Sequence, residues 1–319
     1  MTSITRIMSL AALALGTAAL GACGGGSVAP ASGALSVSMA DTPVDNATSV
    51  VVDFTGIELH NTNGSTFTVT FPSAKQIDLL KLQNGVTGGL TQGESVPAGN
   101  YDWMRLDVLA NKNTQGQSYI TLSTGAQYPL YIPSGSETGL KLNSPFTVAQ
   151  GSTTQLIIEF NLRQSVTSTT DGQNYVLVPS LRLENQLQVG TIAANVDLAA
   201  LTTQQLGSGT QVSQCKGGLF LFSGATASPQ NGGGPNVVDF EPIPYDGTTT
   251  KVSLSIPYVA TGSYTVAATC NYDLYNPAAV LGQTGYQSLH WTVQDNVSVT
   301  ANGTATVSMP SSTTSNVVN

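Results

Sequence analysis

Cysteine is the residue type in this chain that is best suited to covalent chemistry, and the sequence contains three. Cys23 follows Leu20-Gly21-Ala22, at the end of an apolar run that begins at Ile7. The run is shorter than the ~20 residues of a membrane-spanning helix. A leucine, two small residues and a cysteine match the lipobox, where a lipoprotein signal peptide is cut and the thiol is acylated with fatty acids such as palmitate. We therefore expect residues 1–22 to be the signal peptide and Cys23 to carry the lipid. The alternative is an ordinary secretory signal with an accidental cysteine.

The other two cysteines, Cys215 and Cys270, form an even pair in the second half of the chain. An exported protein matures in an oxidising compartment, where such a pair is normally a disulfide. The bond would link residues 55 positions apart and stabilise the fold by about 4 kcal/mol. A reactive or metal-binding thiol pair is the competing interpretation, but no histidine or third cysteine lies nearby to complete it.

The two histidines, His60 and His290, offer little catalytic potential. Zinc sites need closely spaced histidine or cysteine ligands, and none have that spacing, so we expect no metal site of this kind. A Ser-His-Asp hydrolase would have to use one of these two residues, yet the Gly-x-Ser-x-Gly turn typical of such enzymes is absent.

Carboxylates leave one enzymatic alternative open. Glu58, Asp102, Asp107 and Glu159 lie on predicted strands. Two carboxylates from any part of a chain suffice for glycoside hydrolysis. A carboxylate-dependent polysaccharide hydrolase is therefore the alternative to a non-catalytic protein.

The segment from Tyr101 to Val108 predicts a strand with one apolar and one polar face. The alternation places Tyr101, Trp103, Arg105 and Asp107 on one face, and Met104, Leu106 and Val108 on the core face. An exposed Trp103 would be a platform for stacking a sugar or docking a partner. The alternative, for Trp103 and equally for Trp291, is packing under a loop or against another domain.

Basic residues are so rare that each is notable. Arg105, Lys141, Arg163 and Arg182 could recognise an anionic ligand. The alternative is ion pairing at the sheet surface with Asp107, Glu159 or Glu184. We keep Trp103, Arg105, Lys141 and Arg182 as candidate ligand contacts.

A structural calcium ion is the one cofactor that the sequence leaves open. Asp41, Asp45 and Asp53 offer oxygen ligands for a structural calcium ion, but they lack the spacing of a calcium-binding loop. Asp41 also reads as the start of a turn. We expect no other cofactor.

The chain is acidic and weakly charged, with a net charge of −8 and only 9% charged residues. No basic run is present, which argues against nucleic acid as a partner. The expected partners are the membrane, through the lipid, and an unidentified glycan or envelope protein.

Short strands separated by turns fill the chain. The predicted strands are Ala34–Met39, Ser49–His60, Ser65–Phe71, Tyr101–Leu109, Gln127–Ile132, Thr154–Leu162, Tyr175–Leu183, Gly218–Ser223, Lys251–Ile256, Gly262–Cys270, Ser288–Val299 and Thr304–Met309. Turn dipeptides of the hairpin type are Asn63-Gly64, Asp171-Gly172, Asp246-Gly247 and Asn302-Gly303. Ile77–Gln83 fits either a helical turn or a strand, whereas Leu198–Leu206 fits a short helix with Asp197 as N-cap and Gly207 as its end. Strands without intervening helices predict an all-β fold of two antiparallel β-sandwich domains.

The expected organisation has five parts. Residues 1–22 are the signal peptide, 23–33 the lipidated cysteine with a flexible Gly-rich tether, 34–190 the first sandwich, 191–309 the second, and 310–319 a disordered tail.

The two halves share a weak internal repeat. Val96–Tyr101 and Val259–Tyr264 each contain a glycine turn, one intervening residue, a tyrosine and then an alternating strand. Further on, Val148–Thr153 parallels Thr300–Thr304. These parallels favour two related folds.

Roughly residues 33–185 resemble the domain of unknown function 4382 family of bacterial envelope lipoproteins. The matching segments are Gly33–Ser38 with Asp41–Val44, Ile57–His60, Ile77–Leu80 with Leu82–Gly85, Val96–Gly99 with Tyr101 and Arg105–Leu106, Ile132–Gly135 with Thr138–Leu142, and Tyr175–Pro179 with Leu181–Leu183. Glu159-Phe160-Asn161 departs from the family pattern, in which acidic residues are usual at both ends. The second half is similar to transthyretin-like or immunoglobulin-like modules in Gly262–Val266. The resemblance implies an exported β domain and no activity.

Together these features predict a membrane-anchored envelope lipoprotein, most simply of the outer membrane because Gly24 rather than aspartate follows Cys23. It would act as a non-catalytic binding or structural module. The polysaccharide hydrolase and a pilin-like or surface assembly subunit, which would need an exposed unpaired edge strand, are the alternatives.

Overall fold

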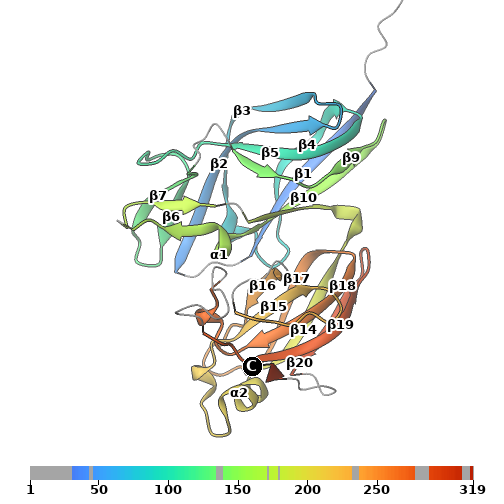
Figure 1. The fold of residues 1–319 in the computed structure, drawn as a ribbon. Coiled ribbons are helices and arrows are strands. Elements are labelled where there is room, and N and C mark those ends of the chain that lie inside the picture. Colours follow the sequence, from blue (N-terminus) through green and yellow to red (C-terminus); the bar gives the residue numbers. More distant parts are fainter. Residues whose placement is uncertain are drawn as a thin grey trace, which may run out of the picture. The chain divides into compact units, whose positions relative to one another are not determined.

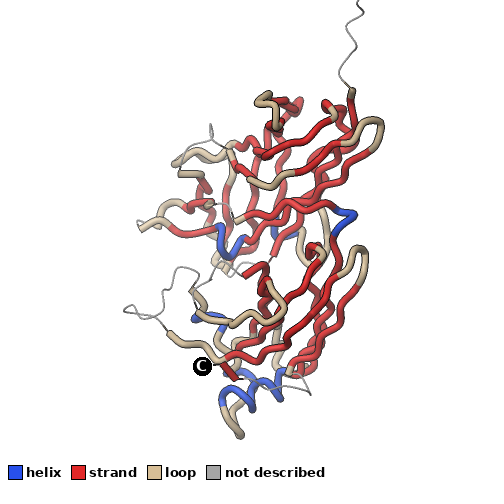
Figure 2. Tube along the Cα trace, turned by 45° about the vertical axis from the view of Figure 1, so that its right-hand side comes forward, coloured by secondary structure: helices blue, strands red, loops and turns tan. Residues whose placement is uncertain are grey.

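The computed structural model describes residues 31–42, 46–133, 139–170, 172–178, 180–231, 237–276, 287–310 and 317–318. They belong to one compact unit, Ala31–Asn319. The expected signal peptide, Cys23 and most of the tether lie outside the described residues, as does Asp45. Within the described ranges, no helix is both long enough and apolar enough to cross a membrane. Strands dominate these ranges, and the helices are short (Figure 2). The all-β prediction is therefore confirmed.

Two sheets make up the first half of the unit. The four-stranded sheet has the order β13 (Leu181–Asn185), β10 (Thr153–Asn161), β1 (Ser32–Thr42), β4 (Gly88–Pro97). The nine-stranded sheet has the order β11 (Val166–Ser168), β12 (Tyr175–Leu177), β7 (Gln127–Tyr131), β6 (Tyr119–Leu122), β2 (Ala47–Asn61), β5 (Gly99–Val108), β8 (Leu140–Leu142), with β3 (Thr66–Asp78) on β2 and β9 (Phe146–Val148) on β5. The short helices here are η1 (Leu79–Lys81), α1 (Leu162–Ser165) and η2 (Gln186–Gln188). The alternate apolar side chains of both sheets meet in one hydrophobic core, which includes Leu35, Phe54, Met104 and Phe160.

Two smaller sheets make up the second half (Figure 1). One has the order β17 (Lys251–Ala260), β14 (Val189–Asp197), β20 (Thr304–Met309), and the other the order β16 (Val237–Pro242), β15 (Gly218–Ser223), β18 (Gly262–Thr269), β19 (Trp291–Val299), β21 (Val317–Val318). The helices are α2 (Leu198–Leu206), η3 (Val212–Gln214) and η4 (Tyr272–Leu274). Cys215 and Cys270 are joined by a disulfide within the hydrophobic core of this half, as expected.

Trp291 lies in a separate, largely aromatic cluster of the second half and is only 1% exposed. Its ring contacts Phe220 and Phe222 edge to face, with centroids 5.0 and 5.8 Å away. The hypothesis that Trp291 is an exposed platform is therefore wrong. Its ring lies on a buried face of the sheet that contains β15 and β19.

The sheets are not purely antiparallel. β1 pairs in parallel with β10, β7 with β12, and β14 with β20. The antiparallel part of the prediction is wrong at these three pairs. In the first and third pairs, an early and a late strand of the same half lie side by side, so a long connection rather than a hairpin separates them.

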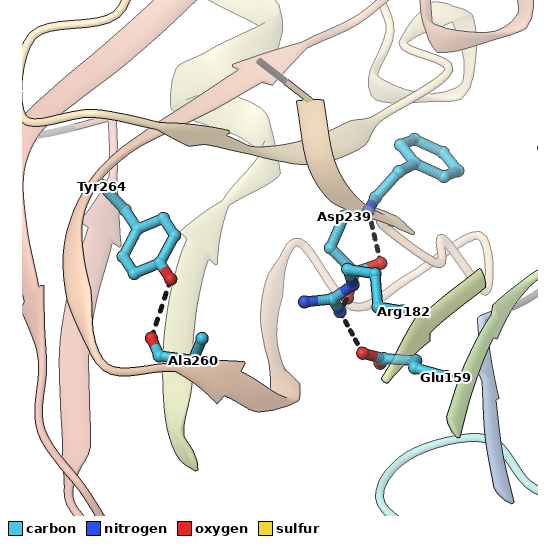
Figure 3. Close-up of polar contacts among 6 residues, drawn as sticks. Glu159, Arg182, Asp239, Ala260 and Tyr264 are labelled. Atoms are coloured by element: carbon cyan, nitrogen blue, oxygen red, sulfur yellow. Dashed lines mark hydrogen bonds and ion pairs between the residues drawn. The ribbon is translucent and has the colours of Figure 1, made fainter. Parts of the chain in front are cut away.

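The internal repeat extends to an equivalent tyrosine hydrogen bond in each half. The Tyr101 hydroxyl donates to the Pro97 carbonyl at 2.6 Å, and the Tyr264 hydroxyl donates to the Ala260 carbonyl at 2.7 Å. Figure 3 draws the second of these bonds. The order β4-β1-β10 in one half is repeated by β17-β14-β20 in the other, with the same parallel and antiparallel pairings. A tyrosine that ties down the turn before its own strand thus recurs at equivalent places in both halves.

Glycines fix a second equivalent contact. A Cβ atom at Gly33 would lie 2.3 Å from the Ala149 carbonyl oxygen, and one at Gly190 would lie 2.4 Å from the Thr300 carbonyl oxygen. In each half, the first strand of the parallel pair therefore passes very close to the turn that precedes the second strand of the pair. Only glycine fits at this contact.

Local signals had mixed success. Helix α2 has the predicted bounds, and the Asp197 carboxylate accepts a hydrogen bond from the Ala200 amide. Asn63-Gly64 joins the paired strands β2 and β3. Asp246-Gly247 and Asn302-Gly303 instead connect strands of different sheets, so the hairpin prediction is wrong there. Asp246 uses its carboxylate to bind the amides of the turn.

Two further predictions resolve differently. Ile77–Gln83 contains both expected alternatives, since β3 ends at Asp78 and η1 follows. In the tail, Val317 and Val318 pair with Thr292 and Trp291. The prediction of a disordered tail is therefore wrong at these two residues, while 311–316 and 319 lie outside the described residues.

Candidate functional site

Three of the four candidate ligand contacts meet on one face of the nine-stranded sheet. In the strand register, His60 on β2 lies opposite Trp103 on β5, and Arg105 lies opposite Lys141 on β8. The alternation predicted for β5 is correct from Trp103 to Val108. Tyr101 departs from it and is only 1% exposed, because the register shifts between His60 and Asn61.

Trp103 is enclosed by its own neighbours. The His60 imidazole stacks on its indole, with centroids 4.8 Å apart and planes at 10°. The Lys141 ammonium and the Arg105 guanidinium lie over the ring at 4.4 and 5.0 Å from its centroid. The half-buried Trp103 is therefore the centre of a cation–aromatic ladder rather than an open platform for stacking.

Arg105 is also held in place electrostatically. Its Nη1 atom donates to Glu58 Oε2 at 2.8 Å. The partner differs from the three acids expected from the sequence, but the interaction is the ion pair of the alternative interpretation. Burial raises the pKa of the neighbouring Asp107, as does the negative charge of Glu58, whereas Arg105 opposes the rise. The ladder thus carries both charges and has no strong preference for an anion.

Arg182 lies elsewhere, on β13, and joins the two halves of the chain. Its Nη2 atom donates to Glu159 on β10 and, at 2.9 Å, to Asp239 Oδ2 on β16 (Figure 3). The Glu159 and Asp239 side chains are only 3% and 2% exposed. Asp239 Oδ1 also accepts a bond from the Phe240 amide. An anionic ligand at Arg182 would have to compete with the two carboxylates that already bind its Nη2 atom, and the ligand contact stays a prediction.

The same cluster holds more acid than base. Burial raises the pKa of Glu159 well above its usual value, and the carboxyl of Asp239 adds to the rise. Burial likewise raises the pKa of Asp239, against the effect of Arg182. Glu241, two residues further along β16, has its pKa raised to about 9 by burial and by Asp239. Two carboxyls thus bind one guanidinium nitrogen, and Glu241 beside them keeps its proton at neutral pH.

Space around this acid pair is limited. The cavity lined by Glu159, Arg182 and Asp239 has a volume of about 80 Å³. Small-molecule sites usually measure ~300–1,000 Å³. Glu159 and Asp239 share both one guanidinium nitrogen and a mutual hydrogen bond, whereas glycosidases hold their two carboxyls ~5–10 Å apart on either side of a substrate. The pair is built to bind Arg182 and has no room for a sugar.

A larger cleft opens on the first half, about 370 Å³ in volume. Its lining includes Phe146 and Thr147 of β9, Glu184 and Asn185 of β13, and Gln188 of η2. We call it the β9–β13 cleft. Burial raises the pKa of Glu184, and the positive charge of Arg182 partly offsets this.

Among the described residues, the proposed calcium ligands do not form a cluster of carboxylates. Asp53 accepts a hydrogen bond from the Gln76 amide at 3.0 Å and is only 6% exposed. Asp41 is 4% exposed, and Asp45 lies outside the described residues. No group of three metal-ligating side chains occurs within the part of the chain that the structure describes. Calcium binding stays a prediction.

Sequence reasoning missed Asp239, Glu241 and the β9–β13 cleft. Asp239 and Glu241 alternate with apolar residues in Val237-Val238-Asp239-Phe240-Glu241, a pattern that predicts a strand with both acids on one face. The cleft combines residues from separate elements, and no local pattern indicates it.

A comparison with known protein families yields a match in the first half of the chain. The family model described as "Domain of unknown function (DUF4382)" matches residues 32–179. The resemblance of the first half to this family, seen in the sequence, is confirmed by the match. No curated protein matches the chain.

Similarity to solved structures is distant. A leucine-rich repeat protein from Bacteroides thetaiotaomicron is 12% identical with a TM-score of 0.19; the match covers 87% of this chain, which spans only 26% of that protein. The major pilin from Streptococcus pyogenes is 14% identical with a TM-score of 0.18, covering 88% of this chain and 98% of the pilin. The fimbrial anchor protein Mfa2 from Porphyromonas gingivalis is 10% identical with a TM-score of 0.18, covering 84% and 99%. TM-scores this low do not define a shared fold.

Proposed function

We propose that the protein is a lipid-anchored module of the bacterial cell envelope, at the outer membrane, that binds a ligand or partner and performs no catalysis. The lipobox that ends at Cys23 and the Gly-rich segment up to residue 33 support the anchor and the tether. An acylated cysteine followed by a tether holds folded β domains at a membrane surface, where they meet polymers and proteins of the envelope.

The state of the Glu159–Asp239 pair is the observation that carries the non-catalytic part of the proposal. These carboxyls are buried, bind the same Arg182 nitrogen and adjoin a cavity of only about 80 Å³. A hydrolase needs its two acids open to a substrate. The pair therefore supports a structural role, and its ion pairs with Arg182 link the two halves.

The proposal also divides the anchored part into two β-sandwich domains, 34–190 and 191–309. Two observations support this division. Among the described strands, no pairing joins β1–β13 to β14–β21, and the tyrosine and glycine contacts of the first half recur in the second.

A screen for hydrolysis tests the absence of catalysis. The purified full chain is incubated with a panel of soluble and insoluble polysaccharides, and new reducing ends are measured over a day. We expect no release above that of heat-denatured protein. Sugar release that disappears in both Glu159→Gln and Asp239→Asn variants, which keep the shape of each side chain, would establish the hydrolase instead.

A further inference from the structure

The β9–β13 cleft forms where the two sheets of the first sandwich leave an edge open. β13 is the end strand of the four-stranded sheet, and β9 pairs with β5 at the margin of the other. Core residues Leu156 and Leu183 reach the floor of the cleft. The volume of about 370 Å³ lies near the lower end of the usual range for small-molecule sites, ~300–1,000 Å³.

An aromatic side chain with a fixed ring forms one wall. The Phe146 ring stacks on Tyr101, with centroids 5.1 Å apart and planes at 8°. Tyr101 is itself fixed by the bond from its hydroxyl to the Pro97 carbonyl. Because the ring is positioned before any ligand arrives, binding against it costs little side-chain entropy.

Polar residues suited to hydroxyls also line the cleft. Among them, Asn185 and Gln188 provide two planar amides. Asn185 Oδ1 accepts a bond from the Leu187 amide, which orients the side chain and leaves its two N–H donors as the groups that can meet a ligand. Gln188 is exposed and supplies both a donor and an acceptor.

Charge and shape restrict the ligand further. The chain carries a net charge of −8, and Glu184 adds a carboxyl at the cleft itself. Arg182, whose positive charge lowers the pKa of Glu184, is bound by Glu159 and Asp239. An acidic ligand would therefore meet repulsion without a free cation. η2 follows directly after β13, so the lining strand ends within the cleft, and a compact ring fits better than an extended peptide.

We infer that the β9–β13 cleft binds a neutral saccharide unit, with Phe146 against the sugar ring and Asn185 and Gln188 bonded to its hydroxyls. This inference rests on the proposed binding function and names the ligand class. An aromatic side chain together with amide groups in one cleft matches a sugar, which has apolar C–H faces and a rim of hydroxyls.

Binding of defined oligosaccharides tests the inference. The purified full chain is titrated by calorimetry with neutral gluco-, manno-, galacto- and N-acetylgluco-oligosaccharides, with uronic acid oligomers and with an unstructured peptide. We expect at least one neutral oligomer to bind. Gln188→Ala should weaken it about tenfold through lost hydrogen bonds. Phe146→Ala should weaken it at least as much. Gln155→Ala is the matched control, because Gln155 is an exposed glutamine on β10 outside the cleft, and its affinity should equal that of the unmodified protein.

Each contrary result has a distinct meaning. Absence of binding by every neutral oligomer, or binding of the peptide or uronic acids alone, overturns the inference. Equal affinity in Gln188→Ala and Gln155→Ala also overturns it, and Gln188→Ala is informative even where Phe146→Ala unfolds. Cleavage of a bound oligomer would instead contradict the non-catalytic function, so the failure of one proposal is distinguishable from that of the other.

Discussion

Replacing Glu241 with glutamine should change how the stability of the protein depends on pH. Glu241 is 6% exposed and lies on β16 beside Asp239. Its pKa is raised from 4.5 to about 9 by burial and by the charge of Asp239. Between these values the folded protein keeps a proton that the unfolded chain releases. The stabilisation is complete below the unfolded pKa and is lost as the pH rises through the folded pKa.

The expected magnitude follows from one retained proton. Each pH unit in this interval lowers the free energy of unfolding by about 1.4 kcal/mol. From pH 6 to pH 8, Glu241 alone should thus cost the unmodified protein about 3 kcal/mol. Glutamine resembles the protonated carboxyl and does not titrate. The loss over the same interval should therefore be smaller in Glu241→Gln by about that amount, and the two proteins should differ by less than ~1 kcal/mol at pH 5.

Denaturant unfolding at half-unit steps from pH 5 to pH 8.5 measures this difference. Glu94→Gln serves as the control, because Glu94 is an exposed glutamate on the edge strand β4. Its curve should run parallel to that of the unmodified protein. Parallel curves for Glu241→Gln as well would show that Glu241 is ionised in the folded state and would refute the reasoning.

Other parts of the structure yield further predictions. Replacing Cys215 and Cys270 together by alanine should lower the free energy of unfolding by about 4 kcal/mol relative to the oxidised protein. The reduced protein is measured alongside. Stability equal to that of the oxidised protein would mean that the disulfide is absent. Tyr101→Phe and Tyr264→Phe should each cost about 1 kcal/mol, since each removes one hydroxyl bond to a carbonyl; a cost in only one half would argue against equivalent roles. Trp103→Ala should cost about 2 kcal/mol, because the half-buried ring packs against His60 and two cations; a stability change below 0.5 kcal/mol would show that the ladder contributes nothing.

Local patterns predicted features that depend on neighbouring residues alone. The two-residue period of β5 placed Met104, Leu106 and Val108 in the core, and the cap and stop of α2 fixed its ends. Both signals act through the backbone of a single element. The repeat is also a local pattern, because the sequence of each half contains a turn followed by a tyrosine.

Features that depend on distant elements escaped prediction. Arg182 sits on a strand whose alternation suggests a solvent-facing side chain, but β16 from the other half brings Asp239 against it. Trp291 was likewise ambiguous until Phe220 and Phe222 of β15 enclosed it. The Asp246-Gly247 turn carries the sequence of a hairpin, yet the strands on either side join different sheets. In each case, the deciding partner is remote in sequence.

The N-terminal cysteine carries the central claim, because anchoring at a membrane determines which polymers and proteins the domains can meet. Cys23→Ser and, as a control, Ser27→Ala are expressed in a bacterium that processes lipoproteins, and membrane and soluble fractions are analysed by immunoblot and by mass spectrometry of the N-terminal peptide. The account predicts a peptide that begins at an acylated Cys23 in the membrane fraction for the unmodified and Ser27→Ala proteins, and release of a folded Cys23→Ser protein from the membrane. A Cys23→Ser protein that stays in the membrane fraction, or an unmodified protein with no acyl group on Cys23, would contradict it.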